Sequence, residues 1–290
     1  MRVRSLVPVL SATLAAACVA WSAPAAAQEG AAALRAFYEK SAPSLASSPF
    51  GRPLLLSSAE TDKGLKGEVY GVLDRSMEEI DRALDTPTRW CEMLMLHLNN
   101  RRCRADDAKQ TVILSVVRKY DVPVEEAADL TFNVRASAPS PEYFDTTLTS
   151  GKGPYGTSNY RISLQGIPLD KGKSFIHFSY AYDQSGSSTL ASKAYLTTFG
   201  SGKVGFTVVG KNRAGEPEYI DGMLGLIERN AMRYFLAVDA YTAAPGDVEK
   251  QLALWHAGAQ KYPRQLNDYT EANYLKFKRE DLQRQGKPRS

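Results

Sequence analysis

Three histidines occur in the sequence, at positions 97, 177 and 256, and each stands apart from the others. A catalytic base needs a nucleophile within hydrogen-bond reach, but the chain contains no G-x-S-x-G, P-loop or H-E-x-x-H motif. His177 lies in a run rich in aromatic residues, so it could face a cavity. A histidine outside any motif is more often a hydrogen-bonded core or surface group. No catalytic residue, cofactor or metal site is therefore predicted.

A second set of candidate groups follows a predicted helix near the C-terminus, which carries Glu228, Arg229, Asn230 and Arg233. Glu228 with Asn230 or Arg233 could place a polar anchor in an otherwise apolar cavity, where it would hold a ligand's hydroxyl or carboxylate. The favoured interpretation is that these charges face solvent, as charged residues on helices usually do. Aromatic residues are frequent between positions 132 and 235, and they are typical of a core or of a ligand-binding wall.

The N-terminal segment has the pattern of a secretory signal. Arg2 and Arg4 precede an apolar run over 6–19, and Ala25–Ala27 supply small residues at a cleavage site. The run is shorter than the roughly 20 residues that span a bilayer, so a retained anchor is the less favoured alternative. Lipidation of Cys18 is a third alternative, but the small Ala15 precedes it where a bulky residue is usual. We expect a signal peptide over 1–27, cleavage near Ala27 and a periplasmic mature chain.

Charge and cysteine content limit the partners of the mature chain. Removal of Arg2 and Arg4 lowers the basic count from 36 to 34 against 32 acidic residues, a net charge of +2. Nucleic acid is not expected as a partner at this balance. Cys91 and Cys103 are the cysteines that remain, and in an oxidising compartment they are predicted to form a disulfide, with two free thiols as the alternative. His97 alone lies nearby, so zinc is not expected.

The elements that must position these residues follow from the hydrophobic periodicity. Helices are predicted over 29–41, 76–84, 86–98, 188–198, 219–243 and 247–262, with a loosely attached helix over 268–284. The first is followed by a Ser/Pro-rich connector over 43–53. The helix at 76 begins with a capping box formed by Ser76 and Glu79. Strands are predicted over 54–60, 66–74, 111–120, 130–137, 143–149, 159–169, 174–183 and 204–210. Tight turns between successive strands favour an antiparallel meander.

This order of strand, two short helices, antiparallel strands and one long helix resembles the helix-grip fold of the START-like superfamily, over about 64–244. The resemblance implies an α+β fold in which a curved antiparallel sheet grips a long C-terminal helix. Residues 28–63 then form an N-terminal helix and connector, and 245–290 form a C-terminal helical extension. Three segments are similar to a group of uncharacterised exported proteobacterial proteins, for which no chemistry is implied: 90–92, 203–207 and 228–234.

The resemblance also implies a cavity between sheet and helix, of the apolar kind that takes small molecules. The expected function is periplasmic binding or transfer of a lipid or other apolar small molecule. One alternative is a cyclase- or hydrolase-like enzyme that uses His177 or a helix carboxylate. Another is an envelope scaffold that docks a protein through residues 247–284. The basic residues there, Lys278 among them, suggest either contact with anionic headgroups or, preferably, a solvated tail. The candidate ligand-binding residues are Phe132, Phe144, Tyr160, His177, Tyr180, Met223, Ile227, Asn230 and Tyr234.

Overall fold

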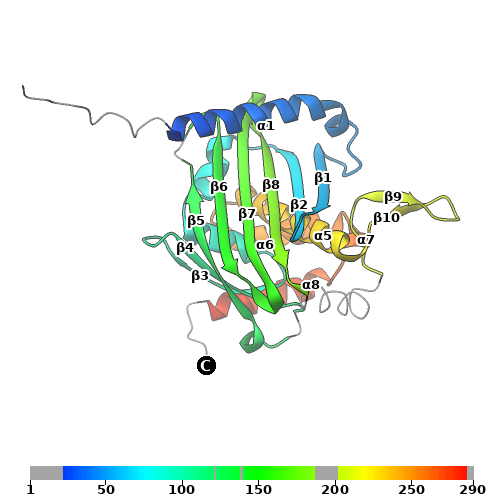
Figure 1. Ribbon diagram of the computed structural model, residues 1–290. Coiled ribbons are helices and arrows are strands. Elements are labelled where there is room, and N and C mark those ends of the chain that lie inside the picture. Colours follow the sequence, from blue (N-terminus) through cyan, green and yellow to red (C-terminus); the bar gives the residue numbers. More distant parts are fainter. Residues whose placement is uncertain (1–21, 121, 138–139, 187–201, 286–290) are drawn as a thin grey trace, which may run out of the picture.

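The computed structural model describes residues 22–120, 122–137, 140–186 and 202–285, and its centre is a curved antiparallel sheet (Figure 1). Eight strands of the described chain pair in the order β1-β2-β8-β7-β6-β5-β4-β3. All neighbouring strands are antiparallel, which confirms the predicted α+β class. The strands are β1 Leu54–Glu60, β2 Gly64–Leu73, β3 Asn100–Asp106, β4 Thr111–Val116, β5 Ala128–Ala136, β6 Phe144–Lys152, β7 Thr157–Leu169 and β8 Lys173–Gln184.

The short helices between β2 and β3 begin at the residues that the sequence predicts. In α2 (Met77–Ala83), the Ser76 hydroxyl accepts from the Glu79 amide at 3.3 Å, and the Glu79 carboxylate accepts from the Ser76 amide at 2.8 Å. The capping box is thus confirmed. In α3 (Pro87–Leu94), Thr86 caps the first turn and Pro87 stands where a proline costs no hydrogen bond. The disulfide between Cys91 and Cys103 is also confirmed, and it ties α3 to β3.

Both faces of the sheet are covered, and strand alternation decides which side chain meets which helix. Leu65, Val69 and Leu73 of β2 are buried toward α5 (Gly222–Ala243), the long helix that the sheet grips. The sheet meets α5 closely at Gly67, where an added Cβ would lie 3.0 Å from the Ile227 carbonyl oxygen.

The opposite face packs against α1 (Ser22–Ala46), which crosses the strands in Figure 1. Phe37 of α1 stacks on Tyr70 of β2 with 4.1 Å between ring centroids. This helix continues beyond Pro43, where the sequence predicts a connector. The reason is tertiary packing, because Leu34 in the middle of α1 and Leu45 in its last turn are both buried against the sheet.

The C-terminal segment is packed onto the domain, so the expectation of a loosely attached last helix is wrong. After α5 come α6 (Val248–Gln260), α7 (Pro263–Leu266) and α8 (Glu271–Arg284). Asp247 caps α6 at the start of the helix predicted over 247–262, since its side chain accepts from the Lys250 amide at 3.0 Å. On α8, Tyr274, Lys278 and Asp281 are at most 1% exposed. These three side chains fix α8 to β3 and to the turn before it.

Two further predictions concern the segment between β8 and α5. The strand expected over 204–210 is β9 (Val208–Lys211), which pairs with β10 (Pro217–Tyr219) as a hairpin outside the main sheet. The helix expected over 188–198 and nearly all of the expected signal peptide lie outside the described residues. Within the described ranges, no helix is both long and apolar enough to cross a membrane. Single turns of 3-10 helix complete the fold at η1 Val124–Glu126, η2 Pro154–Gly156 and η3 Asp170–Gly172.

Candidate ligand-binding cavity

A cavity of about 560 Å³ lies between α5 and the strands β4, β5, β7 and β8. Its sheet side is apolar, with Leu114, Leu130, Phe132 and Ile162 in the lining. These residues point toward α5 because they alternate along their strands with residues of the other face. The volume lies within the range of roughly 300–1,000 Å³ that is usual for small-molecule sites.

Four tyrosines add aromatic walls with polar ends. Tyr160 stacks on Tyr182 with 5.2 Å between ring centroids, and Tyr180 lies 5.5 Å from Tyr234. Burial raises the pKa of Tyr180 well above its usual value and raises the pKa of Tyr234 to about 12, so both hydroxyls stay protonated. The hydroxyls of Tyr180 and Tyr182 make no hydrogen bond within the described part of the chain. They can therefore donate to a bound molecule.

The helix side of the cavity carries charge. Arg229, Asn230 and Arg233 of α5 line it together with Lys203 and Asp268 from loops. Arg233 Nη2 lies 2.5 Å from Asp268 Oδ2, and Lys203 pairs with the other oxygen of the same carboxylate. Burial alone would raise the pKa of Asp268, but the charges of Arg233 and Lys203 outweigh burial and hold the pKa at about 2. Asp268 is therefore ionised and shared by two cations.

The expectation that the charges of this helix face solvent is wrong. Glu228 is 0% exposed, Arg229 1% and Arg233 7%. Glu228 does not line the cavity. It accepts from Ser58 Oγ at 2.8 Å, from Thr207 Oγ1 at 2.6 Å, and from the amides of Phe206 and Thr207 at 2.5 and 3.0 Å. These four bonds offset the cost of burying the carboxylate and fix the loop before β9 to β1 and α5.

The structure brings some of the predicted ligand-binding residues together and separates others. Those that line the cavity are Phe132, Tyr160, Tyr180, Asn230 and Tyr234. Phe144, His177, Met223 and Ile227 lie outside it. Phe144 instead covers Gly166, where an added Cβ would lie 2.2 Å from its ring. Ile227 packs on Gly67 of β2, and Met223 is partly buried against the main core.

His177 lies on the other face of the sheet, under α1. Its ring stacks on Tyr70 at 4.1 Å, and its two nitrogens lie 2.9 Å from Glu68 Oε1 and from Gln165 Oε1. Tyr180, three positions along β8, faces the cavity. Because side chains alternate along a strand, the odd positions around 177 face α1 and the even ones face α5. The histidine is thus a hydrogen-bonded core residue.

Several lining residues were missed by sequence reasoning, and they come from the turn and strand before β4. His97 stacks on Tyr234 with 4.4 Å between centroids, and its Nδ1 accepts from the Asn99 amide at 3.1 Å. Burial, together with the positive charges of Arg233 and Lys278, lowers the pKa of His97 well below its usual value. The ring is therefore neutral at the pH of most compartments.

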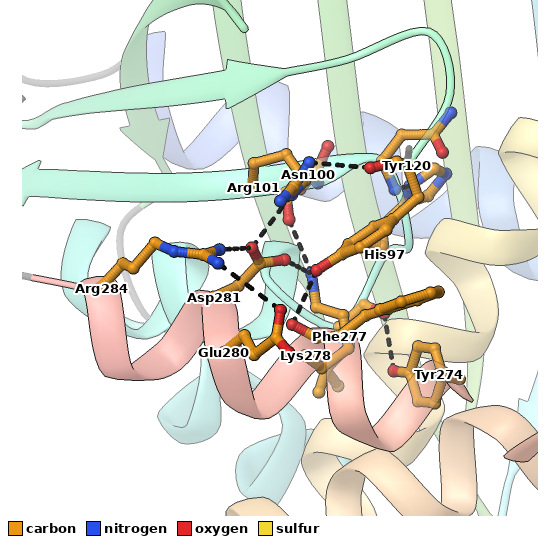
Figure 2. Close-up of polar contacts among 12 residues, drawn as sticks. His97, Asn100, Arg101, Tyr120, Tyr274, Phe277, Lys278, Glu280, Asp281 and Arg284 are labelled. Carbon is orange, nitrogen blue, oxygen red and sulfur yellow. Dashed lines mark hydrogen bonds and ion pairs between the residues drawn. The ribbon is translucent and has the colours of Figure 1, made fainter. Parts of the chain in front are cut away.

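Helix α8 supports this wall from behind (Figure 2). Lys278 Nζ donates to the carbonyl of Asn100 at 2.7 Å and to that of His97 at 3.3 Å. The Tyr120 hydroxyl donates to the Phe277 carbonyl at 2.9 Å. Asp281 accepts from Arg101 Nε at 3.0 Å. Because His97, Asn100 and Tyr120 all line the cavity, the position of α8 determines the shape of that wall.

Within the described ranges, no group of three or more His, Cys, Asp or Glu side chains is placed to hold a metal ion.

No family model and no curated protein matches the sequence. Solved structures similar to the chain include the lipid transfer and protein localization domain of human StarD13, at 11% identity and a TM-score of 0.35. That match covers 49% of this chain and 76% of the domain. Norcoclaurine synthase from Thalictrum flavum is similar at 12% identity and a TM-score of 0.34, covering 51% of this chain and 87% of that one. A conserved protein from Geobacillus kaustophilus is similar at 11% identity and a TM-score of 0.35. That match covers 61% of this chain and 95% of the other.

The description of the fold rests on the sheet and α5 of this chain, and these likenesses add nothing about its function. The similarity to an exported proteobacterial group stays a prediction.

Proposed function

We propose that this protein binds a small, largely apolar molecule in the cavity between its sheet and α5. The observation that carries the proposal is the cavity itself, about 560 Å³ in volume, with leucines, Phe132 and six tyrosines among its described lining residues. Such a site buries the apolar body of a ligand and leaves a few hydroxyls to orient it. A lipid acyl chain and an aromatic metabolite both fit this description.

We further propose that the protein works in the periplasm. The N-terminal pattern of Arg2, Arg4, an apolar run and Ala25–Ala27 supports export. The disulfide between Cys91 and Cys103 supports an oxidising compartment, because such bonds are rarely kept in the cytosol. Peripheral contact with the membrane, through which an apolar ligand could be exchanged, is compatible with this location.

No specific observation favours the enzyme or the scaffold alternative. His177 and Glu228, the two groups that suggested acid–base chemistry, both lie outside the cavity lining. The C-terminal helices, which suggested a docking surface, bury Tyr274, Lys278 and Asp281 against the domain itself. Ligand binding is therefore the function to test first.

The test is native mass spectrometry of the mature protein purified from its own periplasm, followed by organic extraction. The expected result is a stoichiometric apolar molecule that is lost in Val116→Trp, because Val116 lines the cavity and the larger ring fills it. Val208→Trp is the matched control, since Val208 is 54% exposed on the β9–β10 hairpin. A protein that carries no ligand and binds no apolar dye would overturn the proposal.

A further inference from the structure

Two tyrosines of β8 face the cavity with hydroxyl groups that the described chain leaves without a hydrogen bond. Tyr180 is 9% exposed and Tyr182 is 7% exposed, and both line the cavity. Buried hydroxyls in native proteins nearly always have a hydrogen-bond partner. Neither hydroxyl has one within the described residues, and neither oxygen is among the fully enclosed unpartnered atoms of those residues. Both hydroxyls therefore open on the cavity, and the contents of the cavity must satisfy them.

The two hydroxyls belong to one part of the cavity wall. Tyr180 and Tyr182 are two positions apart on β8, so their side chains leave the same face of the sheet. Their ring centroids lie 5.7 Å apart. Tyr160 of β7 stacks on Tyr182 and lies 6.1 Å from Tyr180, and its hydroxyl is hydrogen-bonded to Thr157 Oγ1 at 2.8 Å. Tyr180 and Tyr182 thus place two available donors side by side in an aromatic wall.

This part of the wall is uncharged. Burial raises the pKa of Tyr180 and of Tyr182 well above the usual value, so both phenols stay protonated. Within the described chain, the neighbouring groups that add to these shifts are other tyrosines rather than charged side chains. A carboxylate or an ammonium group placed here would gain no counter-charge from these neighbours, and burying such a group is costly. An uncharged oxygen needs only the hydrogen bonds that the two hydroxyls can donate.

We propose that the ligand is an uncharged molecule whose apolar body carries a carbonyl oxygen, as an ester, a ketone or an amide does, and that Tyr180 and Tyr182 donate hydrogen bonds to this oxygen. A carbonyl oxygen has two lone pairs, so one oxygen can accept from both hydroxyls. The apolar body lies against Phe132 and Ile162. This inference rests on the proposed function, because it names the chemical class that the cavity takes. A hydrocarbon of the same shape binds more weakly, because it leaves both hydroxyls without water and without a partner.

Two matched probes, butyrophenone and butylbenzene, test this inference in the mature protein. They share one skeleton and differ at a single position, where butyrophenone has a carbonyl group and butylbenzene has a methylene group. Isothermal titration calorimetry measures both affinities in the wild type and in Tyr180→Phe/Tyr182→Phe, which removes the two hydroxyls and keeps the rings. The double variant should bind butyrophenone about tenfold more weakly, which is 1.4 kcal/mol. Its affinity for butylbenzene should stay the same or rise.

The double variant is expected to fold, because neither hydroxyl has a hydrogen bond to lose within the described chain. Tyr38→Phe is the matched control, since Tyr38 packs on Phe175 at 4.9 Å under α1, on the other face of the sheet. It should change the affinity for neither probe.

Infrared spectroscopy then locates the oxygen. The carbonyl stretch of bound butyrophenone, isotope-labelled at its carbonyl carbon, should lie at lower frequency than in hexane, because hydrogen bonding weakens the carbonyl bond. In the double variant it should return toward the hexane value. The accurate mass of the molecule extracted from the purified protein distinguishes a lipid ester from an aromatic ketone or amide.

The outcomes separate this inference from the proposed function. If neither probe binds and an apolar dye does not bind either, the cavity takes no ligand and both proposals fail. If butylbenzene or the dye binds and butyrophenone does not, ligand binding stands and the carbonyl class is overturned. The carbonyl class is also overturned if the double variant weakens both probes equally or leaves butyrophenone unchanged, because the oxygen would then not meet these hydroxyls.

Discussion

Lys278 and Asp281 form an ion pair in which Nζ lies 3.2 Å from Oδ2 and neither side chain is exposed to solvent. Asp281 also accepts from Arg101 of β3 at 3.0 Å. One carboxylate thus compensates two buried cations (Figure 2). Lys278 also donates to the carbonyls of His97 and Asn100, which line the cavity. This cluster is what makes α8 part of the domain.

Asp281→Asn is expected to destabilise the protein by about 3–5 kcal/mol, because it leaves Lys278 and Arg101 buried without a counter-charge. Urea denaturation followed by circular dichroism measures the change. Glu249→Gln is the control, since it breaks an ion pair with Arg279 in which both side chains are about half exposed. Its effect should be small. An equal loss of stability in the two variants would contradict the inference that a buried ion pair matters more to stability than an exposed one.

The stability of the protein should rise with pH through the titration of Lys278. Burial is the main cause that lowers its pKa to about 8, although Asp281 opposes the shift. Between about pH 8 and pH 10 the unfolded chain therefore binds more protons at this residue than the folded one, so raising the pH favours folding. The measurement is the difference in unfolding free energy between the wild type and Lys278→Met across this range. A difference that stays flat or falls would refute the assignment.

Glu228→Gln is expected to destabilise the protein by roughly 2 kcal/mol or more. The glutamine NH₂ group would replace one of the two carboxylate oxygens, and it cannot accept the hydrogen bonds that this oxygen receives. The amides of Phe206 and Thr207 should lose protection, which hydrogen–deuterium exchange measures at each residue. Glu218→Gln changes a nearby exposed carboxylate and serves as the control. Unchanged exchange at Phe206 would show that Glu228 does not hold this loop.

Gly71→Ala tests the close approach of the sheet to α5. An added Cβ would lie 2.6 Å from the ring of Phe235, so either the ring or the helix must shift. Overpacking of this kind costs about 1–3 kcal/mol, which a thermal shift assay detects. At Gly151 a Cβ would meet nothing within 4 Å, so Gly151→Ala should change the melting temperature little. An equal change of melting temperature in the two variants would mean that Gly71 and the ring of Phe235 are not in close contact.

The disulfide between Cys91 and Cys103 is expected to contribute about 3 kcal/mol, as a short closed loop does. The double variant Cys91→Ala/Cys103→Ala should unfold at lower urea concentration than the oxidised wild type. Addition of dithiothreitol should lower the stability of the wild type and leave the double variant unchanged. If dithiothreitol does not change the urea denaturation of the wild type, the disulfide adds nothing to its stability.

Local patterns were sufficient to predict most strands. In β8, Tyr180 and His177 differ in parity, which places them on opposite faces of the sheet, so the prediction that both bind the ligand did not follow the alternation of the strand. Patterns of this kind also predicted β1, β2, the capping box of α2 and the starts of α3 and α6. They reflect interactions between residues close together in the chain, which a single sequence displays.

Strand β3 was not predicted, because the residues that stabilise it lie far away in the sequence. It contains Asn100, Arg101 and Arg102, all buried, and the counter-charge of Arg101 is Asp281 on α8. The pairing of Lys203 and Arg233 with Asp268 is equally distant. No periodicity in the sequence indicates such pairs, so the charged side of the cavity could not be assembled from the sequence.

The attachment of α8 to β3 also sets an order of events during biogenesis. The residues that fix the wall of the cavity, Lys278 and Asp281, lie on α8 and are synthesised after the sheet and α5. Until they arrive, Arg101 has no partner on α8, and the backbone of His97 and Asn100 has not received its hydrogen bonds from Lys278. The wall of the cavity is therefore completed only after α8 has been synthesised, so a chain that stops before α8 would lack the contacts that fix this wall.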